Sequence, residues 1–593
     1  MIRLNEEQQA AVDFKGNLVV TACPGSGKTR VLTARVIRAL SELTSLRERV
    51  VALTYTNRAA DEIQARLDLA NVDADRLWAG TIHSFALEWI LRPYAPYSED
   101  LRNGFAIASE FYTDQLLEEL KASAGLGVFD EVSPHLTRDG VQVNTNSQAR
   151  RVFTQYKATL RANNLIDYDD VLYLGYKLLV QIPEIAKTLA SIVRVVCVDE
   201  VQDIQDLQYG ILSTISKAAS SPVTLFFVGD ENQSIYESLG ALSKTPQEIA
   251  EEFGLPEIGH LELNGNYRSS QRIIDLYREF RPNVPLIESR ASYAAEMGIV
   301  TFDNQTVALD DLSSVIAGRI ADAIADGVPT HEICVVAPRW TQVRAIARRL
   351  VNELPEVDFD APGLSPLHSS RENFWFKVAR LLLTVPSPKR TRTRLRWAKE
   401  ALADLRAIAR ISIPELIETP RRLLRLLNSL SSDETEGLAY LRDVFKQFLG
   451  AIKLDVEGCV ALREAYEGFF GKAERHLTNA SDSLPSDVES FRRLFSHPAG
   501  VVVSTCHGVK GEEYETVIAF GLLRGFVPHW NAIFGGDDDL ATDMEAKLLY
   551  VICSRAKRRL HLISESGRQT KKRRPYETSY LLAGVEFGFD EHF

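Results

Sequence analysis

Short apolar runs recur along the chain, and most end in small or polar residues before a longer stretch with helical apolar spacing. The run Ile192–Val198 is almost continuously apolar, which is typical of a strand buried on both faces of a parallel sheet. This alternation of strands and helices predicts an α/β fold. The runs begin at Leu18, Val50, Leu77, Ile192, Val223, Ile333, Val501, Val517 and Leu560.

The first run breaks into a glycine-rich turn that leads into a helix. Gly25 and Gly27 let backbone N–H groups approach a phosphate closely, and the helix N-terminus adds partial positive charge. Lys28 would reach the β- and γ-phosphates, and the hydroxyl of Thr29 would bind Mg²⁺. The first position of this consensus holds Ala22 in place of glycine. The strand, loop and helix together predict a binding site for ATP and Mg²⁺.

Two carboxylates directly follow the buried run Ile192–Val198. Adjacent acids at the carboxyl end of such a strand are difficult to explain as packing, whereas they suit ATP hydrolysis beside a phosphate loop. We expect Asp199 to bind Mg²⁺ and Glu200 to activate the attacking water. Gln233 follows the next strand, where its amide is placed to sense the γ-phosphate.

Other polar segments allow two interpretations each. Hydroxyl groups after the runs that begin at Val50 and Leu77 suit contacts to a phosphodiester backbone, but they also suit helix capping and turns. The segment from Lys389 to Leu427 is rich in lysine and arginine and is predicted to be helical. Such a helix is either a solvated face or a nucleic-acid contact.

Composition sets broad limits on the class of protein. The 593 residues are 45% apolar and 25% charged with a net charge of −12, typical of a globular chain of about four domain-sized units. This charge gives no sign of nucleic-acid binding, although it does not exclude a local basic channel. The six cysteines are far apart, which favours reduced thiols over disulfides, zinc or iron–sulfur clusters. With no apolar membrane span and no signal-like start, we expect a cytoplasmic protein.

The ordered motifs resemble the UvrD/Rep/PcrA-like helicases of superfamily one, from Leu4 to about Leu562. The resemblance implies two RecA-like, parallel-sheet P-loop domains that clamp ATP between them, each with an inserted, mainly helical subdomain. It also implies movement on DNA driven by ATP hydrolysis. The expected first core is residues 1–90 and 185–265 with the insertion 91–184, and the expected second core is residues 266–385 and 496–593 with the short insertion 386–495.

The resemblance assigns residues to the adenosine part of ATP. A predicted helix with Asn5 as its N-cap carries Gln8, which matches the glutamine that reads adenine. Arg30 and Tyr267 match the pair that sandwiches adenine, which fits cation–π and stacking chemistry. Glu513 matches the ribose contact.

The resemblance also assigns residues to the phosphates. Gln233 matches the γ-phosphate sensor, and Arg268 and Arg555 match two arginines that reach the γ-phosphate from the second core. Such arginines can contribute roughly 10³–10⁵ in rate. Because they lie across the cleft, hydrolysis would be tied to domain closure. The expected phosphate-loop contacts are Gly25, Ser26, Gly27, Lys28 and Thr29, and the expected catalytic set is Lys28, Glu200, Gln233, Arg268 and Arg555.

For DNA, the resemblance implies a groove across both cores that holds a single strand or the tail of a duplex. The family moves 3′ to 5′, so the same polarity is expected here. Alternating grip by the two cores, as the cleft opens and shuts, would move the strand. The expected DNA contacts are Thr54, Tyr55, Thr56, Asn57, Thr81, His83, His507 and Lys510.

One motif departs from the family. The family reads Gln-Ser-Ile-Tyr-Gly-Trp-Arg-Gly-Ala, and this chain has Ser238 and Leu239 in place of the tryptophan and arginine. Stacking of a base on an aromatic side chain is worth roughly 1–3 kcal/mol. A second hypothesis therefore stays open: an accessory NTPase subunit with weak unwinding, beside an OLD-family nuclease in a Gabija-type antiviral defence complex.

We predict that the purified chain hydrolyses ATP but unwinds a 3′-tailed duplex poorly on its own, because Ser238 offers no ring for a base. Strand displacement and ATP turnover, measured on the same preparation, check this. Efficient unwinding by the chain alone would contradict the prediction, and co-purification with a nuclease would favour the accessory role.

Overall fold

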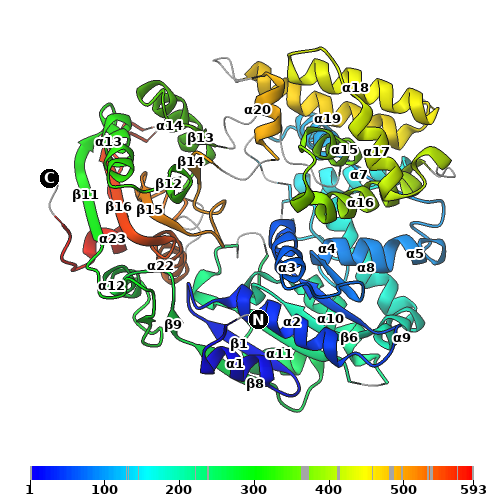
Figure 1. Cartoon of the computed structure of the whole chain (residues 1–593), viewed down its shortest axis with the longest axis horizontal. Helices are drawn as coiled ribbons and strands as arrows, with labels where there is room; N and C mark the ends of the chain where they lie inside the picture. Colours follow the sequence, from blue (N-terminus) through cyan, green and yellow to red (C-terminus); the bar gives the residue numbers. More distant parts are fainter. Residues whose placement is uncertain are drawn as a thin grey trace.

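Two parallel sheets and a group of helices beside them make up the computed structural model (Figure 1), which confirms the expected α/β class. Ser238 and Leu239, on which the unwinding prediction rests, lie outside the described residues. The structure describes residues 3–127, 130, 132–144, 146–220, 222–236, 240–361, 367, 373–409, 414–456, 458–479, 486–495, 499–530, 533, 538–570 and 572–590.

The first sheet has six strands in the order β3-β2-β6-β7-β1-β8, and every neighbouring pair is parallel. The carboxyl ends of these strands therefore meet at one edge, where ligands of such sheets bind. We call this sheet and its helices the first lobe. It comprises β1 (Leu18–Ala22), β2 (Arg49–Leu53), β3 (Leu77–Gly80), β6 (Val193–Val198), β7 (Thr224–Gly229), β8 (Gly259–Leu263), α1 (Glu6–Asp13), α2 (Lys28–Glu42), α3 (Asn57–Leu69), α10 (Asp206–Lys217) and α11 (Pro246–Phe253).

The second sheet also has six strands, in the order β11-β16-β15-β12-β14-β13, and every neighbouring pair is again parallel. Its loops likewise emerge at one edge. We call this sheet, its helices and a short two-stranded sheet the second lobe. It comprises β9 (Gly265–Asn266), β10 (Glu288–Ser289), β11 (Ile299–Ala308), β12 (Ile333–Ala337), β13 (Phe359–Asp360), β14 (Val501–Thr505), β15 (Tyr514–Ala519), β16 (Ala556–Ser566), α12 (Gln271–Glu279), α13 (Leu312–Ala325), α14 (Trp340–Glu353), α22 (Asp538–Cys553) and α23 (Tyr580–Gly584).

Helices between β3 and β6 form the first helical insertion. Helix α8 packs on α10 of the first lobe, so this part shares a core with the sheet. Lys157 on α7 joins α8 through buried ion pairs of 2.7 Å to Asp167 and 2.8 Å to Asp170. The elements are α4 (Ile82–Phe85), a π-helical turn (Ala86–Leu91), α5 (Arg92–Tyr94), β4 (Ala106–Ile107), α6 (Glu110–Ser123), α7 (Ser147–Ala162), β5 (Leu165–Ile166), α8 (Tyr168–Gln181) and α9 (Pro183–Ile192).

Helices between β13 and β14 form the second helical insertion, at the upper right of Figure 1 beside α7. They have their own core, in which Trp375 is fully buried with its ring centroid 4.8 Å from that of Phe445. The indole N–H of Trp375 donates to the carbonyl of Leu462 at 3.0 Å. The elements are α15 (Phe374–Leu383), α16 (Thr391–Ala409), α17 (Pro420–Ser429), α18 (Gly437–Ile452), α19 (Val460–Asn479) and α20 (Val488–Arg493).

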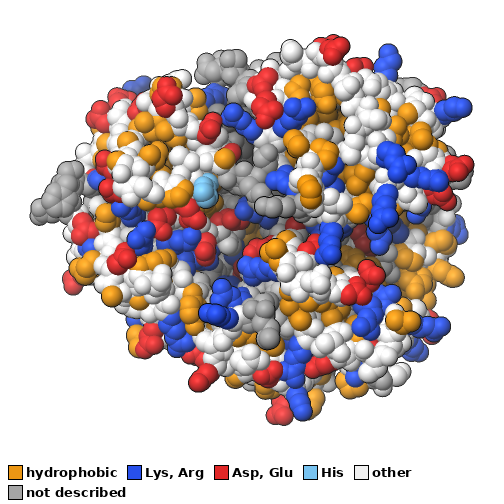
Figure 2. All heavy atoms as spheres, viewed as in Figure 1, with side chains coloured by type: hydrophobic (Ala, Val, Ile, Leu, Met, Phe, Trp, Pro, Cys, Tyr) orange, Lys and Arg blue, Asp and Glu red, His pale blue; other side chains and the backbone are white. Residues whose placement is uncertain are grey.

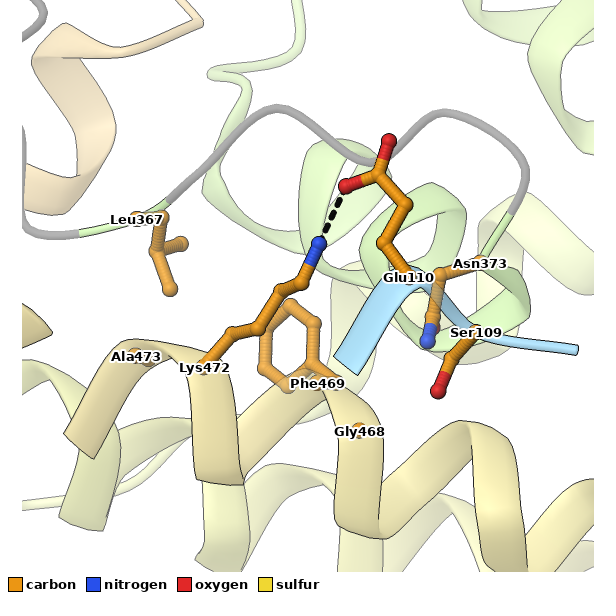
Figure 3. A pocket seen from close by; sticks show the side chains of 8 residues that line it. All are labelled: Ser109, Glu110, Leu367, Asn373, Gly468, Phe469, Lys472 and Ala473. Carbon is orange, nitrogen blue, oxygen red and sulfur yellow. Dashed lines mark hydrogen bonds and ion pairs between the residues drawn. The ribbon is translucent and has the colours of Figure 1, made fainter. Parts of the chain in front are cut away.

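The two insertions touch where the N-terminus of α6 meets α19. Lys472 forms an ion pair with Glu110, and the two side chains point toward each other beside a small cavity (Figure 3). A Cβ on Gly468 would lie 2.8 Å from Oγ of Ser109, so glycine permits this close approach. The cavity involves only insertion residues and residues next to them, away from the loops that follow β1 and β6.

Arginines of the basic segment have partners within the protein. Arg394 is buried and donates to the carbonyl of Leu381 at 2.9 Å. Arg396 on α16 forms an ion pair with Asp61 on α3. Nη1 of Arg392, also on α16, lies 3.5 Å from Oδ1 of Asp68, also on α3. These contacts hold the second insertion against the first lobe, a third role that the sequence did not suggest.

A further feature of the sequence is its set of six cysteines. All six cysteines are free thiols, and all except Cys459 are buried. The buried thiols therefore contribute to packing in the cores around the sheets.

Across the described stretches of chain, no helix combines the length and apolar character needed to cross a bilayer.

Replacing Trp375 by alanine should destabilise the second insertion by about 3–5 kcal/mol, because a fully buried indole and its hydrogen bond are lost. Limited proteolysis and thermal unfolding would show the insertion opening at a lower temperature than in the unmodified protein. Leu416→Ala is the control, because that side chain is 50% exposed and should change stability by less than about 1 kcal/mol. Equal effects of the two substitutions would contradict the prediction.

Candidate active site

The loop between β1 and α2 turns at two glycines. Gly25 and Gly27 have φ of +68° and +84°, in the left-handed region that other residues rarely adopt. A Cβ on Gly25 would lie 2.6 Å from Cβ of Arg268, and one on Gly27 would lie 2.9 Å from Nε2 of Gln8. The loop is therefore held closely between α1 and the second lobe, and only glycine fits at these two positions.

The start of α2 presents polar groups that lack side-chain partners. Gly27 is the N-cap and supplies no side-chain hydrogen bond, and Oγ of Ser26 is buried without a hydrogen-bond partner among the described residues. Lys28 and Thr29 are the first two residues of the helix. Free N–H groups and the partial positive charge of a helix N-terminus favour an anion. A phosphate group fits this cradle.

Helix α1 lies against the loop. Asn5 is its N-cap, as predicted, and its side chain accepts from the backbone N–H of Gln8 at 2.7 Å. The side chain of Gln8 is 2% exposed, and its Nε2 donates to the carbonyl of Ser26 at 2.8 Å. Gln8 thus supports the phosphate loop directly.

Tyr267 and Arg30 lie at the mouth of the loop. The backbone N–H of Tyr267 donates to the carbonyl of Gly25 at 2.9 Å, and its hydroxyl accepts from Nδ2 of Asn5 at 2.6 Å. The tyrosine is 37% exposed, and Arg30 is also exposed. Both side chains are therefore open to a base on the solvent side of the loop.

The acidic pair follows β6 as predicted. Glu200 has φ +51°, a strained conformation for a residue other than glycine, and its Oε2 accepts from Nε2 of Gln202 at 2.5 Å. Burial and the neighbouring Glu200 raise the pKa of Asp199. Burial would raise the pKa of Glu200 too, but Lys28, Lys510, the hydrogen bond from Gln202 and Arg555 together lower it. Glu200 is thus the more acidic member of the pair.

Gln233 makes a contact that joins the two lobes. Its Nε2 donates to Asp230 at 2.7 Å, and its Oε1 accepts from Nη2 of Arg555 at 2.7 Å. Arg555 follows α22 in the second lobe and is 1% exposed. Burial lowers the pKa of Arg555 to about 9, so the guanidinium stays charged at neutral pH. A buried cation of the second lobe thus reaches the end of a strand in the first.

Arg268 is the second cation at this boundary. Its Nε donates to Glu513 at 2.8 Å, and its Nη1 donates to the carbonyl of Ser554 at 2.9 Å. Burial would raise the pKa of Glu513, but Arg268, Lys557 and Arg555 together outweigh burial and lower it. Arg268, Arg555 and Glu513 therefore meet beside the loop that contains Gly25, although they are far apart in the sequence.

The hydroxyl groups after β2 and β3 cap helices. Oγ1 of Thr54 donates to the carbonyl of Thr56, and the hydroxyl of Thr56 caps α3, whose first residue is Asn57. The hydroxyl of Thr81 caps α4. These bonds support the capping and turn interpretation of Thr54, Thr56 and Thr81, while the segments still lie at the edge where the parallel strands end.

Aromatic rings lie at the same strand ends. Tyr55 stacks on Tyr236 with ring centroids 4.7 Å apart and an interplanar angle of 23°. His83 stacks on Tyr168 at 4.1 Å and 16°. Burial lowers the pKa of His83 to about 4, so this imidazole is neutral at neutral pH and offers no positive charge to a phosphate.

His507 and Lys510 lie in the turn after β14. The hydroxyl of Tyr236 donates to the carbonyl of His507 at 3.2 Å. The side chain of Lys510 is 6% exposed, and its ammonium forms an ion pair with Asp203 at 2.6 Å. The structure therefore brings His507 and Lys510 next to Tyr236, which stacks on Tyr55, but the lysine charge points into the protein.

On the face shown in Figure 2, lysine and arginine side chains are interspersed with aspartate and glutamate. No broad field of one sign covers this face. A nucleic acid held here would depend on local contacts, because a mixed surface provides little long-range attraction.

Two family matches cover much of the chain. Residues 4–254 match the UvrD/REP helicase N-terminal domain, and residues 472–567 match the UvrD-like helicase C-terminal domain. The chain is 30% identical over 646 residues to the ATP-dependent DNA helicase UvrD1 of Mycobacterium tuberculosis (strain ATCC 25618 / H37Rv), covering 94% of this chain and 82% of that protein. The chain belongs to the UvrD/Rep helicase family. This confirms the resemblance seen in its motifs.

Other relatives agree. The putative ATP-dependent DNA helicase YjcD of Bacillus subtilis (strain 168) is 25% identical over 640 residues, covering 96% of this chain and 80% of that protein. The ATP-dependent DNA helicase Rep of Escherichia coli (strain K12) is 30% identical over 329 residues, covering 51% of this chain and 48% of that protein. The similarity therefore extends over nearly the whole chain.

Some residues around this candidate site were not predicted from the sequence. Asn266 is fully buried and donates to the carbonyl of Pro24 at 2.8 Å, so it ties the phosphate loop to the second lobe. Asp203 pairs with Lys510, and Tyr168 and Tyr236 supply rings to their neighbours. Each lies within three residues of a motif residue or in an acidic run, but only the contacts show what each side chain does.

Gly25→Ala should weaken nucleotide binding at least about tenfold, which is about 1.4 kcal/mol. The added Cβ would lie 2.6 Å from Cβ of Arg268, at a φ of +68°. Titration with a fluorescent ATP analogue measures the effect. Gly125→Ala is the matched control, because that glycine has φ +71° with nothing within 4 Å of its Cβ position. Similar affinities for both variants would refute the tight-loop interpretation.

Proposed function

We propose that the chain is an ATP-dependent DNA helicase that moves 3′ to 5′ along single-stranded DNA or the tail of a duplex. The hydrogen bond of 2.7 Å between Arg555 of the second lobe and Gln233 of the first carries this proposal. It connects the segment after β7 in the first sheet with the residue that directly precedes β16 in the second sheet. The same proposal retains the expected division of the chain into two RecA-like cores with two insertions.

ATP is the proposed nucleotide. Gly25, Ser26, Gly27 and Lys28 would bind its phosphates through backbone N–H groups, a hydroxyl and an ammonium. The orphaned hydroxyl of Ser26 and the left-handed glycines support this assignment. The remaining assignments to adenine, ribose and Mg²⁺ are Gln8, Arg30, Tyr267, Glu513, Thr29 and Asp199.

Hydrolysis would use the ionised carboxylate of Glu200 as the general base for water. Mg²⁺, bound by Thr29 and Asp199, would neutralise phosphate charge. Arg268 and Arg555 would stabilise the charge that develops on the γ-phosphate, and Gln233 would orient it. Because both arginines come from the second lobe, turnover depends on how closely the lobes approach.

DNA would lie across the carboxyl edges of both sheets. The stacked rings of Tyr55 and Tyr236 supply aromatic surface there, which suits single-stranded bases. Of the other expected contacts, Thr54, Thr56, Asn57, Thr81, His83 and His507 remain proposals. The accessory-subunit alternative, with its nuclease partner, rests on Ser238, Leu239 and the short second insertion.

Two measurements test the proposed function. ATP turnover should rise when single-stranded DNA is added, and a 3′-tailed duplex should be displaced in preference to a 5′-tailed one. Turnover that ignores DNA, without any partner present, would overturn the proposal and favour the accessory role.

Glu200→Gln should abolish ATP turnover, by about 10³-fold or more, while ATP still binds, because the amide cannot accept the proton of water. Steady-state hydrolysis and equilibrium binding of labelled ATP, measured side by side, check this. The control is Glu48→Gln, which changes an exposed carboxylate directly before β2 and should hydrolyse ATP normally. Continued turnover in Glu200→Gln would refute the assignment of the base.

A further inference from the structure

Lys510 reaches from the second lobe into the first. It lies in the turn between β14 and β15, and its Nζ contacts Asp203 at 2.8 Å and 2.6 Å and the carbonyl of Gln233 at 2.6 Å. An ammonium group has three N–H donors, so all of them are used. The two side chains of the ion pair are 6% and 1% exposed. We call this set the Lys510 bridge.

The bridge is poorly explained as a source of stability. Burying two opposite charges costs several kcal/mol of solvation per ion, and well-packed apolar residues often replace such a pair without loss. It also leaves Lys510 no donor for a DNA phosphate. What the geometry does provide is a fixed position for the two segments of the first lobe that the bridge joins.

The first of these segments holds the proposed base. Asp203 ends the short turn Val201–Asp203 that begins directly after Glu200. Gln202 in the same turn donates to Glu200 at 2.5 Å and accepts from the backbone N–H of Asp230 at 3.0 Å. Fixing Asp203 therefore fixes the strained backbone from which the Glu200 carboxylate projects.

The second segment holds the proposed γ-phosphate sensor. Lys510 binds the carbonyl of Gln233, whose side-chain amide accepts from Arg555. Three residues further on, the hydroxyl of Tyr236 donates to the carbonyl of His507, and the ammonium of Lys510 lies 4.8 Å from the centre of the Tyr236 ring. The turn that carries His507 and Lys510 thus holds the segment from Gln233 to Tyr236 at both ends.

We propose that Lys510 is a positioning residue for ATP hydrolysis, which places the Glu200 carboxylate and the Gln233 amide relative to each other only when the two lobes are together. This inference rests on the proposed function. Because Tyr236 also stacks on Tyr55, the same turn connects the ATP site with the edge where DNA is proposed to lie.

Lys510→Met tests this with single-stranded oligodeoxythymidine present. We expect kcat for ATP to fall at least about tenfold while KM for ATP stays within about threefold, because positioning acts on the transition state and ATP contacts are untouched. Asp203→Asn should change kcat in the same direction. Lys177→Met is the control, since that lysine pairs with Asp100 inside the first insertion and should leave both constants unchanged.

A second variant separates positioning from folding. Lys510→Met/Asp203→Leu leaves no buried unpaired charge, so its melting temperature should recover. If the bridge positions the site, kcat stays low in the double variant; recovery of kcat would show a merely structural pair and overturn the inference. An unchanged kcat, or a raised KM with normal kcat, in Lys510→Met would also overturn it. Absence of ATP turnover in the unmodified protein would instead refute the proposed function.

Discussion

A buried amide holds the phosphate loop to the rest of the molecule. Asn266 is fully buried, donates to the carbonyl of Pro24, and accepts from the backbone N–H groups of Arg268 and Ser269 at 2.7 Å and 2.8 Å. An unpaired buried amide is costly, so these bonds fix the connection between the lobes against the loop. Tyr267 and Arg268 consequently both lie beside Gly25 of the loop. The proposed nucleotide site is thus shared by two sheets that each bury a separate core.

Opposing charges then set the chemistry of this shared site. Asp199 is buried and the adjacent Glu200 is half-buried, a combination that favours loss of one charge. Lys28 from the first lobe and Lys510 from the second are among the groups that lower the pKa of Glu200, while burial and Glu200 itself raise the pKa of Asp199. Since one of the two lysines belongs to the other lobe, the electrostatics of the proposed base depend on how the lobes are arranged.

Much of the fold was predictable from local pattern. The apolar runs that begin at Leu18, Val50, Ile192 and Val223 correspond to strands, and the Asn5 cap is confirmed. Both features depend on residues that are neighbours in the sequence, because a strand buried on both faces is a continuous apolar run and a cap is a polar residue at a helix start. The strand β13 (Phe359–Asp360) was not predicted, because two residues are too few to show a hydrophobic period. The sequence left the basic segment Lys389–Leu427 open between a solvated face and a nucleic-acid contact. The structure adds a third role, because two of its arginines form ion pairs with α3 of the first lobe.

The sequence by itself determined the phosphate loop, the acidic pair and the family, because glycines that require positive φ and acids at a strand end are local signals. Only the tertiary structure decided which charges meet. Lys510 and Asp203 are 307 residues apart, and no spacing indicates that this lysine turns inward to a carboxylate instead of outward to DNA. His83 likewise is a half-buried, neutral imidazole that stacks on Tyr168. Side-chain partners depend on packing between distant segments, and hydrophobic periodicity does not encode that packing.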